Sequence, residues 1–206
     1  MPTFDAMHLL RPGVLDGATI LLARGPGAAP LGEALAGACA SLGAGVHVCE
    51  AQLQDGRYAD ADDGALGGAP LQAVDLLAVD AGSLIDAVDG AGGALEGQDG
   101  LIAAMDAVWS LTQAVADEAF IAPGRPGRIV YLAPPAGTPL AHAAVAALEN
   151  LARTLSIEWA RYRVTTVAVA PGADTTPGRV AAVAAYLASP AGAYFSGCLL
   201  DLRGPA

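Results

Sequence analysis

Short apolar runs alternate along the chain with longer segments that are rich in alanine and leucine. The runs with strand character are residues 18–23, 46–49, 76–79, 128–132, 165–170 and 198–202. The segments whose apolar residues recur at helical spacing are residues 31–42, 99–120, 140–162 and 180–188. Strands that alternate with helices are typical of βαβ units. The pattern therefore predicts an α/β fold in which helices cover both faces of a parallel sheet.

The polar stretch from Gln52 to Val74 is rich in Gly and Asp, and it predicts no regular element. Its carboxylates Asp60, Asp62 and Asp63 favour a solvated loop over a cation site, because the Gly and Glu of a calcium loop are missing. No internal repeat or linker divides the chain, so we expect residues 1–206 to form a single domain with a shortened middle region.

The uncharged segment 180–200 has the length of a membrane span. Its middle is interrupted by Ser189, Pro190 and Gly192, so we expect a helix followed by a strand instead, and no membrane partner. Residues 1–17 lack the apolar core of a signal peptide.

The composition excludes some partners. The chain has a net charge of −11 with ten Lys and Arg residues, and these are scattered, which argues against binding to a phosphate backbone. We therefore expect no nucleic acid partner. Cys39, Cys49 and Cys198 are dispersed and form no CxxC or Cys/His motif, which favours apolar packing in a reducing cytoplasm and no metal site.

Several motifs follow one another in a recognisable order. They are DGATILL at 16–22, LGAGVHV at 42–48, DLLAVDAG at 75–82, GRIVY at 127–131, AVAPG at 168–172 and YLAS at 186–189. Together they resemble the short-chain dehydrogenases/reductases, especially the bacterial β-ketoacyl carrier-protein reductases. The resemblance implies a Rossmann-like, doubly wound parallel sheet in three αβα layers.

The family's cofactor loop, Thr-Gly-x-x-x-Gly-x-Gly, corresponds here to residues 24–32. Gly32 matches the last glycine, but Pro26 and Pro30 occupy positions where the family needs backbone N–H donors for the pyrophosphate. Gly25 and Gly27 remain as cradle candidates. By the same resemblance, Glu50 takes the place that holds the adenosine ribose, and Thr175 the place that contacts the nicotinamide amide. We nevertheless expect no cofactor on this chain, and NAD(P) only on an active partner.

The resemblance also locates the catalytic tetrad, and this chain lacks it. The Tyr and Lys positions hold Ala141 and Val145, the Ser position holds Ala133, and the Asn position aligns with Ala104. A Tyr exchanges the proton of the carbonyl/alcohol pair, and a neighbouring ammonium lowers its pKa. Alanine and valine can do neither.

Two further features bear on activity. The family's helical lid over the substrate is missing, because residues 176–178 lead almost directly into the closing helix. A relocated pair, Tyr131 and His142, is the alternative route to catalysis, although no Lys or Arg between Arg128 and Arg153 would lower the Tyr131 pKa.

The long helices on either side of the tetrad strand pair with a second subunit in the family, and this chain retains both. We therefore expect a non-catalytic subunit that assembles with an active short-chain dehydrogenase/reductase, as a heterodimer or heterotetramer. The alternatives are an NAD(P)-dependent oxidoreductase with relocated catalytic residues, and a homodimeric scaffold or nucleotide sensor. The interface candidates are Met105, Val108, Ala144, Ala147, Leu148, Leu151 and Leu155.

Overall fold

The computed structural model describes residues 10–27, 29–50, 53–54, 57–58, 65–90 and 97–204. Six strands form one sheet in the order β10-β9-β8-β7-β1-β2, and every neighbouring pair is parallel. The strands are β1 (Thr19–Arg24), β2 (Gly45–Glu50), β7 (Leu76–Asp80), β8 (Gly127–Leu132), β9 (Val164–Pro171) and β10 (Cys198–Leu202). The six strands predicted from the sequence are confirmed.

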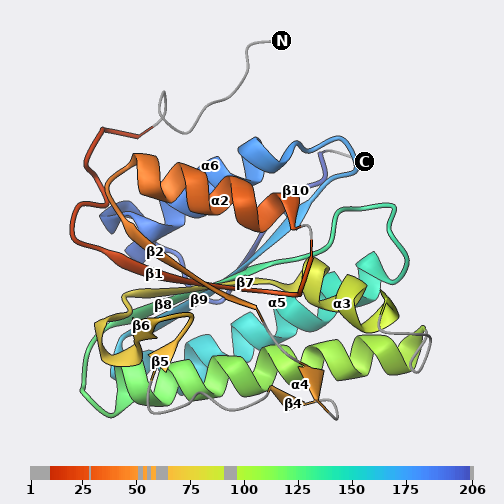
Figure 1. Ribbon diagram of the computed structural model, residues 1–206, viewed down its shortest axis with the longest axis horizontal. Coiled ribbons are helices and arrows are strands. Elements are labelled where there is room, and N and C mark those ends of the chain that lie inside the picture. The colour runs from red at the N-terminus through yellow and green to blue at the C-terminus, as the bar shows by residue number, and fades with distance from the viewer. Residues whose placement is uncertain are drawn as a thin grey trace.

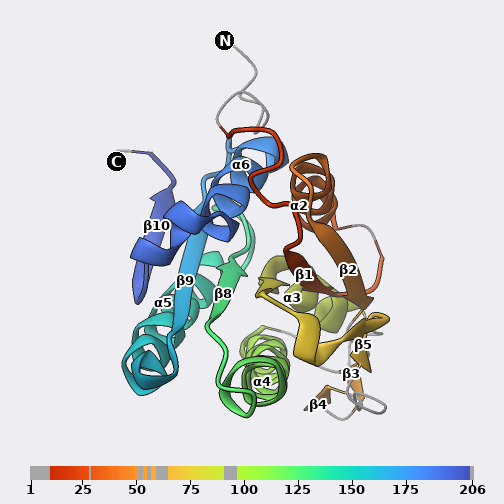
Figure 2. The ribbon, with the colours of Figure 1, turned by 90° about the vertical axis from the view of Figure 1, so that its left-hand side faces the viewer.

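Helices cover both faces of this sheet. Figures 1 and 2 show α2 (Pro30–Ser41) and α6 (Pro177–Ala188) on one side, and α3 (Ala81–Gly90), α4 (Gln98–Val115) and α5 (Ala141–Glu158) on the other. A π-helical segment (Ala116–Ile121) continues α4, and a 3-10 turn (Ala160–Tyr162) follows α5. The predicted three-layer, doubly wound α/β fold is confirmed.

The alternating direction of side chains along each strand explains why the protein has two apolar clusters, one on each face of the sheet. In β1, Leu21 packs into the cluster under α4 and α5, whereas Ile20 and Leu22 pack into the cluster under α2 and α6. All three side chains are at most 1% exposed. Successive strand residues point to opposite faces, so a strand covered on both sides is apolar throughout.

Helix α3 was missed by the sequence analysis. Asp80 caps it in the manner of an N-cap residue: its Oδ1 accepts the Ser83 N–H at 3.2 Å, three residues on. The Ser83 hydroxyl donates back to the Asp80 carbonyl at 2.8 Å. A helix of ten residues that begins directly at a strand end offers little periodicity to detect.

The stretch from Gln52 to Val74 contains more structure than expected. Two short antiparallel pairs lie in it, β3 (Leu53–Gln54) with β4 (Arg57–Tyr58) and β5 (Ala65–Leu66) with β6 (Ala69–Pro70), followed by a 3-10 turn (Leu71–Ala73). Gly67 and Gly68 both have positive φ, as a two-residue hairpin turn of type I′ requires. The prediction of no regular element was therefore wrong here. Asp60, Asp62 and Asp63 lie outside the described residues.

None of the three cysteines forms a disulfide bond within the described residues. Cys39 and Cys49 are buried and Cys198 is half-buried. Burial raises the pKa of the Cys39 thiol to about 12. This thiol therefore stays protonated and packs as a small apolar group. None of the described helices is long and apolar enough to cross a membrane.

Candidate functional site

A cavity of about 330 Å³ lies at the carboxyl ends of the strands, where the strand order reverses between β1 and β7. Open α/β sheets place ligands at this point. The β1–α2 loop, the start of α3 and the segments after β8 and β9 supply its walls. The lining residues are Ala29, Pro30, Leu31, Asp80, Gly82, Ser83, Asp86, Pro134, Pro135, Thr138, Ala173, Thr175 and Pro177.

The β1–α2 loop uses its backbone donors within the chain. The Gly25 N–H donates to the Ser83 hydroxyl at 3.0 Å, and the Gly32 N–H donates to Asp80 Oδ2 at 3.1 Å. Gly25 is required by this close approach, because a Cβ there would lie 2.1 Å from the Ser83 carbonyl oxygen. The carboxylate of Asp80 thus accepts the N–H of Gly32 in the first turn of α2. A helix N-terminus in this place holds a phosphate in nucleotide-binding folds.

Arg24 and Glu50 form an ion pair at the ends of β1 and β2. The guanidinium of Arg24 lies 2.7 Å from Glu50 Oε1 and donates to the Gly27 carbonyl at 3.0 Å. The Arg24 guanidinium therefore binds both Glu50, the residue that was expected to hold a ribose, and Gly27 of the β1–α2 loop. The Arg24 Nε is buried and makes no hydrogen bond with the described residues.

Asp80 is the central polar group of the cavity wall, and it is 2% exposed. Burial raises the pKa of its carboxyl, and the negative charge of Asp86 acts in the same direction. The N–H groups of Ser83 and Gly32 act in the opposite direction, because they stabilise the ionised form. The net pKa shift is upward, so the site disfavours negative charge.

Three of the four positions that the resemblance assigns to the tetrad lie inside apolar clusters. Ala133 and Val145 belong to the core beneath α4 and α5, and Ala104 packs against Ala144 and α3. Ala141, at the first position of α5, is 4% exposed. None of these four described residues lines the cavity. Their side chains fill space and carry no group that transfers a proton.

The relocated pair considered from the sequence is not assembled. Tyr131 is fully buried in β8, and its hydroxyl donates to Thr112 Oγ1 at 3.2 Å. Burial raises the Tyr131 pKa far above its usual range, which opposes formation of a phenolate. His142 is exposed at the start of α5. Tyr131 is therefore a core residue of this chain.

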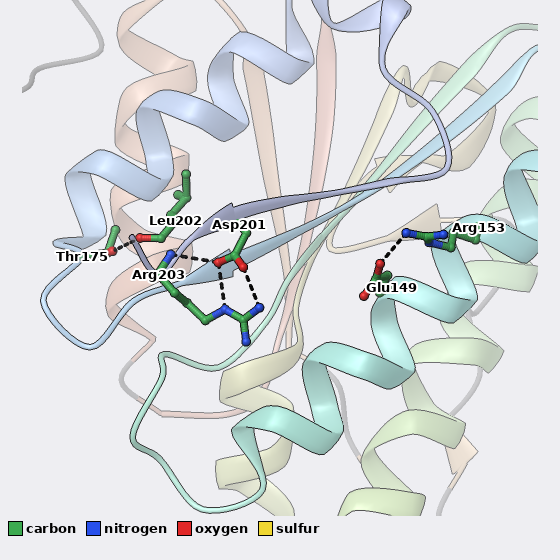
Figure 3. Close-up of polar contacts among 6 residues, drawn as sticks. All are labelled: Glu149, Arg153, Thr175, Asp201, Leu202 and Arg203. Carbon is green, nitrogen blue, oxygen red and sulfur yellow. Dashed lines mark hydrogen bonds and ion pairs between the residues drawn. The ribbon is translucent and has the colours of Figure 1, made fainter. Parts of the chain in front are cut away.

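Thr175 has a structural partner on either side. Its hydroxyl accepts the Gly172 N–H at 2.9 Å and donates to the Leu202 carbonyl at 3.1 Å, which ties the β9–α6 connection to β10 (Figure 3). The hydroxyl proton is thereby engaged, so Thr175 closes a turn in the position where the family contacts nicotinamide. The expected absence of a lid agrees with the short connection, since β9 ends at Pro171 and α6 begins at Pro177.

The interface candidates require correction. Val108, Ala144 and Leu148 are 0% exposed and Leu155 is 1% exposed, so these four belong to the core of this chain. The helical stripe that suggested them faces the sheet. Met105, Ala147 and Leu151 are half-buried.

The outward surface carries different side chains. Ile102 and Trp109 of α4 are 51% and 39% exposed, and Ile157 of α5 is 79% exposed. Ile102 and Trp109 are seven residues apart and share one side of α4. We call Ile102, Trp109 and Ile157 the outer face.

The fold is that of known dehydrogenases. The chain is similar to a citronellol catabolism dehydrogenase of Pseudomonas aeruginosa, with 22% identity, a TM-score of 0.68, and coverage of 97% of this chain and 98% of the other. A putative 2-deoxy-D-gluconate 3-dehydrogenase of Agrobacterium tumefaciens with bound NADP gives 20% identity, a TM-score of 0.66 and coverage of 95% and 98%. A Serratia marcescens short-chain dehydrogenase/reductase gives 22% identity, a TM-score of 0.61, and coverage of 91% of this chain and 96% of the other.

No protein-family model matches the chain, and no curated protein matches it. At these identities the similarity establishes the fold, which is the one found in short-chain dehydrogenases/reductases.

The residues present do not fit a nicotinamide dinucleotide. Pro26 and Pro30 supply no N–H, and the amides of Gly25 and Gly32 are already bonded to Ser83 and Asp80. Two carboxylates line the place where a pyrophosphate would lie. The prolines that remove N–H donors from the loop can be read from the sequence. The bonds of Asp80 and Ser83 to the remaining loop amides were not predicted. The signal was an Asp followed three residues later by Ser, directly after a buried strand.

Proposed function

We propose that this chain is a non-catalytic member of the short-chain dehydrogenase/reductase family that assembles with an active homologue and supports it in a hetero-oligomer. The observation that carries the proposal is the filling of all four tetrad positions by Ala104, Ala133, Ala141 and Val145, all of them buried. General acid/base groups contribute about 10²–10⁴-fold to such reactions. Without them the tetrad positions supply no proton donor for a ketone or an acyl thioester.

The outer face supports assembly with a partner. Large apolar side chains in contact with water favour burial by about 25 cal/mol for each Å² of apolar surface. Tryptophan is also enriched among residues that dominate binding energy. In this proposal the helices α4 and α5 face the equivalent helices of the active subunit, which retains its own cofactor loop and tetrad.

The complex would then contain one functional site for each pair of subunits. This chain stabilises the active subunit or shapes the entrance to its substrate site. The proposal places both subunits in the reducing cytoplasm, where dispersed thiols such as those of Cys39, Cys49 and Cys198 stay reduced.

The direct test is co-expression with a short-chain dehydrogenase/reductase that has an intact tetrad and is encoded beside this chain. Light scattering on the purified material should give a hetero-oligomer, and reductase activity should be found in the complex but not in the isolated chain. A stable monomer or symmetric homodimer that ignores this partner at micromolar concentration would contradict the proposal.

A second candidate is an NAD(P)-dependent oxidoreductase. Its support is the similarity to dehydrogenases, two of which are described with bound NADP, and this similarity by itself favours an oxidoreductase over a non-catalytic subunit. The buried Arg24 Nε beside Glu50 adds to it, because an Arg at this place can hold the 2′-phosphate of NADP. Calorimetric titration with NADH and NADPH separates the candidates. Micromolar binding, with turnover lost in Tyr131→Phe or His142→Ala, would establish the enzyme, whereas binding without turnover would favour a nucleotide sensor.

A further inference from the structure

The cavity at the β1–β7 switch point has walls that offer hydrogen-bond acceptors. Three hydroxyls line it, and each donates its proton to a carbonyl of the chain: Ser83 to Asp80, Thr138 to Pro135 and Thr175 to Leu202. Four of the lining residues are prolines, which have no N–H. Their oxygens can still accept a hydrogen bond, although those of Ser83 and Thr175 already accept one each, from the N–H groups of Gly25 and Gly172.

The charge of the walls has the same character. The two ionisable groups among the lining residues are the carboxyls of Asp80 and Asp86, and neither Lys nor Arg occurs among the described lining residues. Each Asp80 oxygen accepts one backbone N–H, which leaves further lone pairs on the carboxylate. The remaining wall is apolar and includes Leu31, Pro134 and Pro177.

We propose that this cavity binds a small organic cation, an ammonium group on a compact apolar body, in the place where the fold elsewhere holds a dinucleotide. The ammonium donates hydrogen bonds to the Asp80 carboxylate and to the hydroxyl oxygens of the lining Ser and Thr residues. The apolar body lies against the prolines and Leu31. A volume of about 330 Å³ is at the small end of ligand sites, which span roughly 300–1,000 Å³.

The electrostatics support this assignment. A buried carboxyl with an acidic neighbour disfavours its own ionisation, and a bound cation removes that penalty. An anion would meet both carboxylates and find few donors. The inference goes beyond the hetero-oligomer and does not depend on it.

The test uses three probes that share a phenyl group and differ in charge: 2-phenylethylammonium, 2-phenylethanol and phenylacetate. Calorimetry and thermal shift on the full chain should show tightest binding for the ammonium probe, by about tenfold over the alcohol, with phenylacetate weakest. Asp80→Asn should weaken the ammonium probe by about tenfold and leave the alcohol unchanged.

Asp86→Asn is a second variant, at an exposed position, and it should weaken the ammonium probe by a smaller factor. Asp106→Asn, on the exposed side of α4, is the matched control and should change nothing. Equal binding of the three probes, tightest binding of phenylacetate, or no ammonium binding up to about 10 mM would overturn the inference. Such a failure would leave the hetero-oligomer untouched, because light scattering measures that separately.

Discussion

The cavity and the outer face are two regions of one protein with opposite kinds of side chain: polar groups that bond within the chain, and apolar groups that contact solvent. In the cavity, Asp80, Ser83 and Thr175 satisfy the backbone and one another. On the outer face, Ile102, Trp109 and Ile157 are large apolar side chains in contact with solvent. The first region uses its polar groups for bonds within the chain, whereas the second presents large apolar groups suited to contact with another protein.

The difference bears directly on the proposed non-catalytic role. Ala or Val at the four buried positions Ala104, Ala133, Ala141 and Val145 costs the core nothing, because such side chains pack well. Leaving Trp and Ile in water is unfavourable unless a partner covers them. Under the proposed function the two regions serve binding rather than catalysis, and the following variants test each side of the comparison.

The largest effect is expected from Trp109→Glu. A charge at this position opposes burial against a partner, so the hetero-oligomer should weaken by about 2 kcal/mol or more, roughly 30-fold. Because Trp109 is 39% exposed, the isolated chain should unfold close to its usual temperature. Light scattering and calorimetry with the active subunit measure the change.

Tyr194→Glu is the matched control, since Tyr194 is 91% exposed and lies outside α4 and α5. It should leave assembly intact. If Trp109→Glu also leaves the complex intact, the outer face is not the contact surface.

Asp80→Ala tests the internal hydrogen bonds of the cavity. It leaves the Gly32 and Ser83 N–H groups without their acceptor, which should lower the free energy of unfolding by about 1–3 kcal/mol. Asp80→Asn retains an acceptor oxygen and should cost less. Urea denaturation measures the free energy of unfolding of both variants. Equal losses would show that a hydrogen-bond acceptor in this side chain contributes nothing to stability.

Tyr131→Phe should have a smaller effect. The variant loses one buried hydrogen bond to Thr112, worth about 0.5–1.5 kcal/mol in the free energy of unfolding. Adding Thr112→Val should recover part of the loss, because no buried hydroxyl is then left alone. Any loss of enzymatic turnover in Tyr131→Phe would instead assign this residue a catalytic role.

The smallest effects concern pH. Burial raises the pKa of Asp80 above its ordinary value of 3.8, so the folded state holds this proton more tightly than the unfolded state. Stability from this group is therefore present below 3.8 and is lost as the pH rises through the folded pKa. Asp80→Asn should abolish this dependence of the free energy of unfolding on pH. Urea denaturation at a series of pH values from below 3.8 upward measures it.

Asp201 provides the opposite sign. Hydrogen bonds from Arg203 lower the Asp201 pKa from 3.8 to about 2 (Figure 3), so this contribution is present above 3.8 and is lost as the pH falls through about 2. The pair is exposed and screened by water, so Asp201→Asn should change the acid limb only slightly. A slope of the same sign for Asp80 and Asp201 would contradict the environments described for the two carboxyls.

Local pattern was sufficient for most of the fold. The six strands are continuous apolar runs because both faces of the sheet are covered, and α2, α4, α5 and α6 have long apolar stripes. The apolar identity of Ala141 and Val145 can also be read directly from the sequence. The short helix α3 escaped detection, because a cap at a strand end is a single local contact.

The sequence by itself determined the layers of this protein and the lack of a proton-transferring group at Ala104, Ala133, Ala141 and Val145, since both depend on residue type and spacing along the chain. Only the tertiary structure decided which side of each helix meets the core, and it corrected Val108, Ala144, Leu148 and Leu155 from interface to interior. It also joined Asp80 to Gly32 and Ser83 to Gly25 across 48 and 58 residues. Such contacts arise when separate strands end at the same edge of a sheet, and periodicity within one segment carries no record of them.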